Sequence, residues 1–177
     1  MKNILIISAT PRKNGNSDVL CDQFMKGAEE SGNKIEKIRL KDKEINYCIG
    51  CGVCIKTHKC TQKDDTQEIL EKMIDADVIV LATPVYFYTM NAQMKTLIDR
   101  CCSEYTRMDD KEFYFIMTAA DPEERSFDRT VESFRAFTSC LNNPQEKGIV
   151  YGAGAWHVGE IQNTPAMDRA YKMGQSV

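Results

Sequence analysis

The sequence lacks a basic excess, a long apolar run and a glycine-rich dinucleotide signature, and each absence removes a class of function. The net charge is −3, with Lys and Arg scattered along the chain, whereas nucleic-acid binders carry a basic patch. No apolar stretch approaches the length of a membrane span, and the run after Lys2 is too short for a signal peptide. No Gly-x-Gly-x-x-Gly occurs, which argues against a dedicated dinucleotide-binding domain. We therefore expect a cytoplasmic protein with neither nucleic-acid nor membrane partners.

Internal repeats, low-complexity tracts and interdomain linkers are also missing, which favours one domain over residues 1–177. Apolar residues make up 42% of the chain and charged residues 28%, a balance typical of a globular core. A chain of 177 residues is long enough to bury about 70% of its unfolded surface. The one long segment without periodicity is 41–64, and loops of that length in compact domains are usually functional or disordered.

Short apolar runs alternate with amphipathic segments along the whole chain. The predicted strands are 4–7, 34–40, 78–81, 113–117 and 148–151. Helices are expected to begin at a cap at Ser17, at a capping box of Asp65 and Glu68, near Met94, near Phe127 and at Thr164-Pro165. The first should end near Gly32 and the last at Gly174. Five strands alternating with five helices predict an α/β fold in which helices cover both faces of a parallel sheet.

The segment after the first apolar run has the composition of a phosphate-binding loop. Residues 10–17 read TPRKNGNS, and no acidic residue occurs in 1–17. A loop that leads into a helix N-terminus offers free backbone N–H groups and the positive end of the helix dipole. Arg12 can bind phosphate bidentately, and Gly15 permits a tight backbone turn. The alternative is an ordinary strand-to-helix turn in which Ser17 caps the helix.

The segment after the third predicted strand has the composition of a binding site for a flat ring. Residues 83–88 read TPVYFY, so three aromatic residues follow Pro84 directly. We expect Phe87 to pack into the core and the two tyrosines to stack on or flank a planar ligand.

The motifs TPRKNGNS and TPVYFYTMNAQMKTLIDR together resemble the NADPH-dependent FMN reductase and iron-sulfur flavoprotein group of the flavodoxin-like superfamily. The resemblance implies a doubly wound sheet of five parallel strands in the order 2-1-3-4-5, in three α/β/α layers. Both motifs then lie at the switch point, where such sheets bind ligands. It also implies an FMN site formed by Ser8, Thr10, Arg12, Asn14, Asn16, Ser17, Pro84, Val85, Tyr86, Phe87, Tyr88, Thr118 and Asp121. Ala9-Thr10 departs from the Gly-Ser frequent in the family but keeps the hydroxyl.

Four cysteines inside segment 41–64 have the spacing of a metal or cluster site. Cys48, Cys51 and Cys54 form a C-x2-C-x2-C run, and Cys60 follows after five residues. Gly50 and Gly52 would let backbone amides turn toward the sulfurs. Within the resemblance, the four thiolates would ligate a [4Fe-4S] cluster that passes electrons to FMN.

The same cysteines fit three other interpretations. They could hold zinc through four thiolates, with His58 as a substitute ligand. A redox dithiol could form between Cys48 and Cys51 or between Cys51 and Cys54. The third interpretation is that the loop carries no chemistry. The remaining cysteines are expected to be buried, inert thiols within helices: Cys21, Cys101, Cys102 and Cys140.

The function we predict is that of an FMN-dependent oxidoreductase. The flavin N5 carries the chemistry, so no catalytic side chain is assigned. By resemblance the donor is NADPH or NADH, the acceptor is a small molecule or a protein, and the chain forms a homodimer or a larger homo-oligomer. Two alternatives are an electron carrier that relays electrons between [4Fe-4S] and FMN, and a zinc or thiol-switch binding protein without flavin. Trp156 is expected to cover the flavin or a subunit contact, and His157 to be a surface residue.

Overall fold

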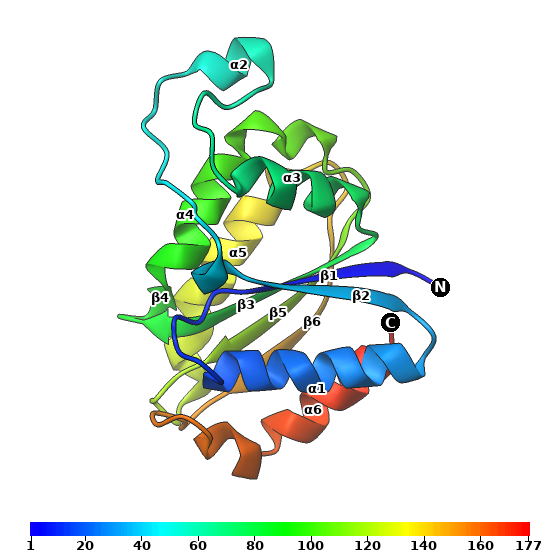
Figure 1. The fold of residues 1–177 in the computed structure, drawn as a ribbon. Coiled ribbons are helices and arrows are strands. Elements are labelled where there is room, and N and C mark those ends of the chain that lie inside the picture. The colour runs from blue at the N-terminus through cyan, green and yellow to red at the C-terminus, as the bar shows by residue number, and fades with distance from the viewer.

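The computed structural model describes residues 1–177, and its centre is one parallel sheet with helices on both faces (Figure 1). The strands are β1 (Asn3–Ser8), β2 (Lys34–Arg39), β3 (Val78–Tyr86), β4 (Thr89–Met90), β5 (Glu112–Thr118) and β6 (Gln145–Gly152). The parallel strands lie in the order β2-β1-β3-β5-β6, which is the predicted flavodoxin-like order. β4 was not predicted; it pairs antiparallel with the end of β3.

The side chains of the central strands alternate between two hydrophobic cores, because successive residues of a strand point to opposite faces. In β1, Ile4 and Ile6 pack with α1 (Asn16–Glu30) and α6 (Ala166–Gln175) on one face. Leu5 and Ile7 belong to the core on the other face. That face is covered by α3 (Thr66–Asp75), α4 (Ala92–Arg100) and α5 (Asp128–Thr138) (Figure 1). The continuous apolar runs are therefore explained by burial on both sides.

The capping box predicted at the N-terminus of α3 does not form. The Asp65 carboxylate does not cap α3; it accepts the backbone N–H of Glu44 at 2.8 Å. The neighbouring Asp64 instead accepts the N–H of Thr66 at 3.1 Å. A contact with a distant loop has therefore replaced the local capping box formed by Asp65 and Glu68.

Two further predicted helix boundaries are wrong. α1 begins at Asn16 with Gly15 as its cap residue, so Ser17 lies inside the first turn and caps nothing. Gly174 does not end α6 but lies within it, where an added Cβ would be 2.0 Å from the carbonyl oxygen of Phe24. Gly174 is therefore required for the close packing of α6 on α1.

Segment 41–64 carries only a short 3-10 turn, η1 (Leu40–Asp42), and the five-residue helix α2 (Val53–Thr57). The part around α2 projects away from the sheet and its layers (Figure 1), whereas Ile45 near the start of the segment packs against the core. None of the helices is both long enough and apolar enough to cross a membrane.

The four cysteines outside this segment divide into two kinds. Cys21 and Cys101 are buried, as predicted. Cys102 and Cys140 are exposed, so the prediction of buried thiols is wrong for them. α4 ends at Arg100 and α5 at Thr138, so neither residue lies within its predicted helix. In the turn after α4 the side chain of Cys101 packs into the core and that of the next residue, Cys102, faces solvent.

Candidate functional site

A cavity of about 320 Å³ lies at the carboxyl ends of β1, β3, β5 and β6, where the strand order reverses. Its walls are formed by Thr10, Arg12, Asn16, Pro84, Val85, Tyr86, Phe87, Thr118, Ala119, Ala120, Ala155 and Trp156. The structure thus brings the two motifs of the sequence together in one cavity, with polar groups on one side and rings on the other.

The polar side of the cavity is the loop between β1 and α1. No side chain caps α1, so the N–H groups of its first turn are left without a side-chain acceptor. The Ser17 hydroxyl in that turn is buried and has no hydrogen-bond partner. Thr10 and Arg12 line the cavity beside this helix end. The unpaired donors and the positive helix end fit a phosphate group.

The backbone of this loop turns at Asn14 rather than at Gly15. Asn14 has φ 53°, in the left-handed region, whereas Gly15 has an ordinary φ of −62°. Gly15 is needed for another reason: an added Cβ would lie 2.4 Å from the Thr10 hydroxyl oxygen. The predicted role of Gly15 is therefore corrected from a turn residue to a site of close packing.

Two predicted phosphate ligands also hold the loop after β6. The Asn16 side-chain amide donates to the carbonyl oxygens of Ala155 and His157, at 3.2 and 2.9 Å, and its oxygen accepts the N–H of Gly159 at 3.1 Å. An Arg12 guanidinium nitrogen donates to the Trp156 carbonyl at 2.6 Å. Asn16 and Arg12 therefore position the wall of the cavity that carries Trp156.

The same loop is held from its other side by Glu160. Its carboxylate accepts the N–H groups of His157 and Trp156, at 2.9 and 2.8 Å. These two donors hold the pKa of Glu160 below its usual value. The Trp156 indole is thus placed at the cavity by backbone contacts, and His157 is exposed, as predicted.

The apolar side of the cavity is a hairpin formed by β3 and β4. Phe87 and Tyr88 connect the two strands with φ of 49° and 66°. The prediction that Phe87 packs into the core is wrong, because its side chain is 100% exposed. β3 continues through Pro84 to Tyr86, so the turn places Phe87 at its tip, against the cavity.

Asn91 anchors this hairpin and was missed by the sequence reasoning. It caps α4 by accepting the N–H of Met94 at 3.2 Å, and its backbone N–H donates to the Thr83 hydroxyl at 3.1 Å. Its side-chain amide donates to the Ala9 carbonyl at 2.6 Å, which ties β1 to the hairpin. An Asn three residues before Met94 was a signal for a helix cap.

The structure leaves five predicted site residues out of the cavity wall: Ser8, Asn14, Ser17, Tyr88 and Asp121. Ser8 is buried at the end of β1, and Asn14 is exposed. The Tyr88 ring lies 5.7 Å from the Arg129 guanidinium. The Asp121 carboxylate accepts the N–H of Glu123 at 2.9 Å within its own loop.

A second, smaller cavity of about 150 Å³ lies in the projecting segment and collects its thiols. Cys48, Cys51, Cys54 and Cys60 all line it, and so does Cys102. Gly50 and Gly52 adopt left-handed φ of 64° and 69°, the turns for which glycine was expected. No group of three or more His, Cys, Asp or Glu side chains is arranged to hold a metal ion. The donor set itself, soft sulfur ligands around one cavity, fits zinc or an iron–sulfur cluster.

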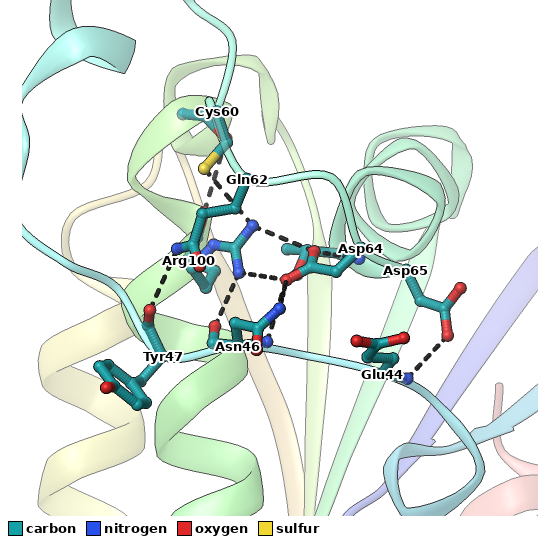
Figure 2. Close-up of polar contacts among 10 residues, drawn as sticks. Glu44, Asn46, Tyr47, Cys60, Gln62, Asp64, Asp65 and Arg100 are labelled. Carbon is teal, nitrogen blue, oxygen red and sulfur yellow. Dashed lines mark hydrogen bonds and ion pairs between the residues drawn. The ribbon is translucent and has the colours of Figure 1, made fainter.

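A buried ion pair between Arg100 and Asp64 fixes this segment to the end of α4 (Figure 2). Their side chains are 1% and 0% exposed. The two guanidinium nitrogens reach the two carboxylate oxygens at 2.6 and 3.1 Å. Arg100 also donates to the Asn46 carbonyl at 2.7 Å and to the Cys60 sulfur at 3.4 Å. One side chain therefore holds both ends of the cysteine segment.

Burial and hydrogen bonding act in opposite directions on Asp64. Burial by itself raises the pKa of this carboxyl, but hydrogen bonds from Arg100 and Thr66 outweigh it and hold the pKa far below its usual value. The backbone N–H of Asn46 adds a further bond at 2.9 Å. Asp64 is therefore an ionised anchor, and its pairing with Arg100 was not predicted from the sequence.

The thiols of the segment differ in their surroundings. The N–H of Val53 and the Thr61 hydroxyl hold the pKa of Cys51 below its usual value. Burial and the neighbouring Cys102 thiol raise the pKa of Cys54. Cys51 is thus the thiol of this segment that the surrounding donors favour as a thiolate.

Comparison with known proteins places the chain among flavoproteins. Residues 2–157 match the family model of NADPH-dependent FMN reductase. An iron-sulfur flavoprotein from Archaeoglobus fulgidus is 44% identical over 94 residues, 53% of this chain and 43% of the relative. One from Methanocaldococcus jannaschii is 45% identical over 97 residues, 55% of this chain and 50% of the relative. The chain thus aligns with about half the length of these relatives.

The fold has close counterparts among solved structures. The structure of an NAD(P)H:quinone oxidoreductase from Methanothermobacter marburgensis superposes with a TM-score of 0.78 at 18% identity, covering 99% of this chain and 95% of the other. At that identity the likeness establishes the fold.

Proposed function

Because this chain belongs to the NADPH-dependent FMN reductase family, we propose that it is an FMN-binding oxidoreductase that takes electrons from NADPH or NADH. The observation that carries the proposal is the cavity at the switch point. It joins an uncapped helix N-terminus and Arg12 to a wall of aromatic side chains. A ligand that carries both a phosphate and a planar ring matches this pair of walls.

The chain's own residues bind and orient the cofactor. Thr10 and Arg12, which line the cavity, and the N–H groups of the first turn of α1 would hold the phosphate. The Ser17 hydroxyl, which lies in that turn without a partner, would be a further donor although it is not part of the cavity wall. Tyr86, Phe87 and Trp156 would flank the ring and exclude water from one of its faces. A flavin held there would supply the redox chemistry, namely acceptance of a hydride and onward transfer of one or two electrons. The protein therefore needs no side chain that acts as an acid or base.

The test is an absorption spectrum of the purified protein before and after added FMN. Flavin bands that bleach under anaerobic NADPH or NADH are the expected result. If the protein binds no flavin even at excess FMN, the proposal is wrong. Arg12→Ala then tests the location of the site, because weaker binding is expected only if the phosphate lies at this loop.

We also propose a second cofactor in the cysteine segment, a [4Fe-4S] cluster held by Cys48, Cys51, Cys54 and Cys60. The supporting observation is that these four thiols line one cavity. The named relatives are iron-sulfur flavoproteins. With such a cluster the chain would relay electrons between a protein partner and FMN. A site with the same ligands but holding zinc would stabilise the segment and carry no electrons.

Iron, zinc and sulfide assays on anaerobically purified protein separate these cases. Matched iron and sulfide support the cluster, and zinc without sulfide supports the structural site. Cys51→Ala is expected to abolish iron–sulfur absorption while flavin stays bound. Cys140→Ala, which removes an exposed thiol outside the segment, serves as the control.

A homo-oligomer and a cytoplasmic location complete the proposal. Exposed rings surround the cavity, with Phe87 100% and Trp156 60% exposed, and a second copy would cover them. The cysteines are all free thiols, which is typical of a reducing compartment. Light scattering after size exclusion tests the first point: a monomer would contradict it.

A further inference from the structure

Cys102 belongs to the cysteine segment in space, although it lies 42 positions beyond Cys60 in the sequence. It lies in the 3-10 turn η2 (Cys101–Ser103), which follows α4 and packs against α2. Its neighbour Cys101 is buried in the core, whereas the Cys102 thiol is exposed and lines the small cavity. The cavity is therefore lined by five thiols, one more than the sequence motif contains.

The Cys102 sulfur lies 4.0 Å from the sulfur of Cys54. Among the free cysteines, this is the one pair whose sulfurs are in hydrogen-bond contact. A disulfide has a sulfur–sulfur length of about 2.05 Å, so the two atoms need to approach by about 2 Å. Cys54 lies in the five-residue helix α2 and Cys102 in the 3-10 turn η2, so the approach would require rotation of these two side chains or a shift of one short element.

We propose that Cys54 and Cys102 form an intramolecular disulfide in the metal-free protein. The oxidant is a low-molecular-weight disulfide such as oxidised glutathione. The Cys102 thiolate attacks this disulfide, forms a mixed disulfide and releases one small thiol. The Cys54 thiolate then attacks the Cys102 sulfur and releases the second small thiol. Two protein thiols are oxidised and one small disulfide is reduced to two thiols, so atoms and electrons balance.

The disulfide removes Cys54 from the set of metal ligands, because only a free thiolate binds the metal. Oxidation and metal loading of the small cavity therefore exclude each other. This consequence rests on the proposed metal site, whereas the disulfide itself does not. The pair would protect an emptied segment from irreversible oxidation until a reductant restores the thiols.

The test is peptide mapping of metal-free protein after treatment with oxidised glutathione, without reduction. The expected product joins tryptic residues 44–56 to residues 101–107. Because each peptide contains more than one cysteine, Cys54→Ser and Cys102→Ser assign the link, and each should abolish it. Cys48→Ser and Cys140→Ser should leave it intact. A link through another cysteine, or a disulfide between two chains, would overturn the proposal.

Preloading the protein with Zn²⁺ tests whether a bound metal prevents formation of the Cys54–Cys102 disulfide. We expect at least a tenfold slower formation of the link with bound Zn²⁺, and recovery of the original rate after a chelator. If the link forms equally fast with Zn²⁺ present, Cys54 is not a metal ligand and the exclusion is wrong. Neither result depends on flavin, so failure of the FMN site would be seen separately.

Discussion

At the tip of the β3–β4 hairpin, two aromatic residues hold backbone angles that glycine or asparagine usually holds. Phe87 and Tyr88 both have positive φ, which two-residue hairpin turns of this kind require. A non-glycine residue in this region costs about 1–2 kcal/mol. Phe87 is also fully exposed, so neither backbone preference nor burial explains why an aromatic residue occupies this position. Such strain persists mostly at functional sites, which agrees with a ring-binding role.

Two substitutions of Phe87 should separate the effect of its strained backbone from the effect of its aromatic ring. Phe87→Gly is expected to raise the free energy of unfolding by up to about 1 kcal/mol, because glycine accepts the positive φ. It should also weaken FMN binding, because the ring wall is lost. Phe87→Leu keeps the strain and loses the ring, so it should weaken binding without added stability. Thermal unfolding and flavin titration of both variants give the measurement, and unchanged affinity in both would exclude Phe87 from the site.

Arg12 is the charged residue of the large cavity and should dominate phosphate affinity. Arg12→Ala is expected to weaken FMN binding by about 10- to 100-fold, because a charged hydrogen bond contributes about 1.5–3 kcal/mol. Part of that loss comes from the freed Trp156 carbonyl, which Arg12 holds at 2.6 Å. Lys13→Ala removes an equal charge from the same loop but not from the cavity wall, so it is the matched control. If both variants lose FMN affinity equally, the effect comes from the net charge of the loop and not from a contact of Arg12 with the phosphate.

At the scale of elements, the end of α4 decides how the cysteine segment is held. The Arg100–Asp64 pair joins residues 36 positions apart and is closed to solvent on both sides. Removing one member of such a pair leaves the other charge buried and unpaired. The anchor is therefore expected to be needed for the fold of the segment as well as for the position of Cys60.

Asp64→Asn should lower the free energy of unfolding by about 3 kcal/mol near neutral pH. The folded-state pKa of Asp64 is depressed, so its contribution is fully present well above the unfolded pKa of about 3.9 and is lost progressively as pH falls toward the folded-state pKa. The difference between wild type and Asp64→Asn should thus shrink from about pH 5 downward. Urea unfolding at several pH values measures it.

The exposed pair of Lys95 and Asp99 provides the control for that experiment. Its side chains are 57% and 46% exposed, so Asp99→Asn should cost less than about 1 kcal/mol at any pH. A pH-independent difference for Asp64→Asn would contradict the assigned ionisation.

At the scale of the molecule, the large cavity is formed by residues at the ends of four strands, so it exists only in the folded protein. A ligand that binds there therefore stabilises the fold. FMN at 100 times its dissociation constant should stabilise the protein by about 2.7 kcal/mol. Riboflavin offers the same ring without the phosphate, so at equal concentration it should raise the melting temperature less. Thermal shift with both ligands makes the comparison. Equal shifts would show that the α1 N-terminus does not bind the phosphate.

The sequence predicted most of the architecture because its signals are local. Apolar runs such as 4–7 report strands buried on both faces, and helical periodicity placed α1 and α4 within a few residues. The errors at Asp65 and Gly174 share a cause. Each residue is of a type that commonly marks a helix end, but in the fold it contacts a distant residue instead. Asp65 accepts the N–H of Glu44, and Gly174 packs against the Phe24 carbonyl. Local preference is weak enough for tertiary contacts to override it.

The sequence by itself determined the order of the elements, the two motifs at strand ends and the cysteine spacing. Only the tertiary structure decided that Asn16 holds the loop after β6, that Phe87 faces outward and that Arg100 anchors the cysteine segment. It also placed Cys102 beside Cys54. The physical reason is that periodicity reports which face of an element is buried. Which residues meet across that face depends on contacts between segments far apart in the chain.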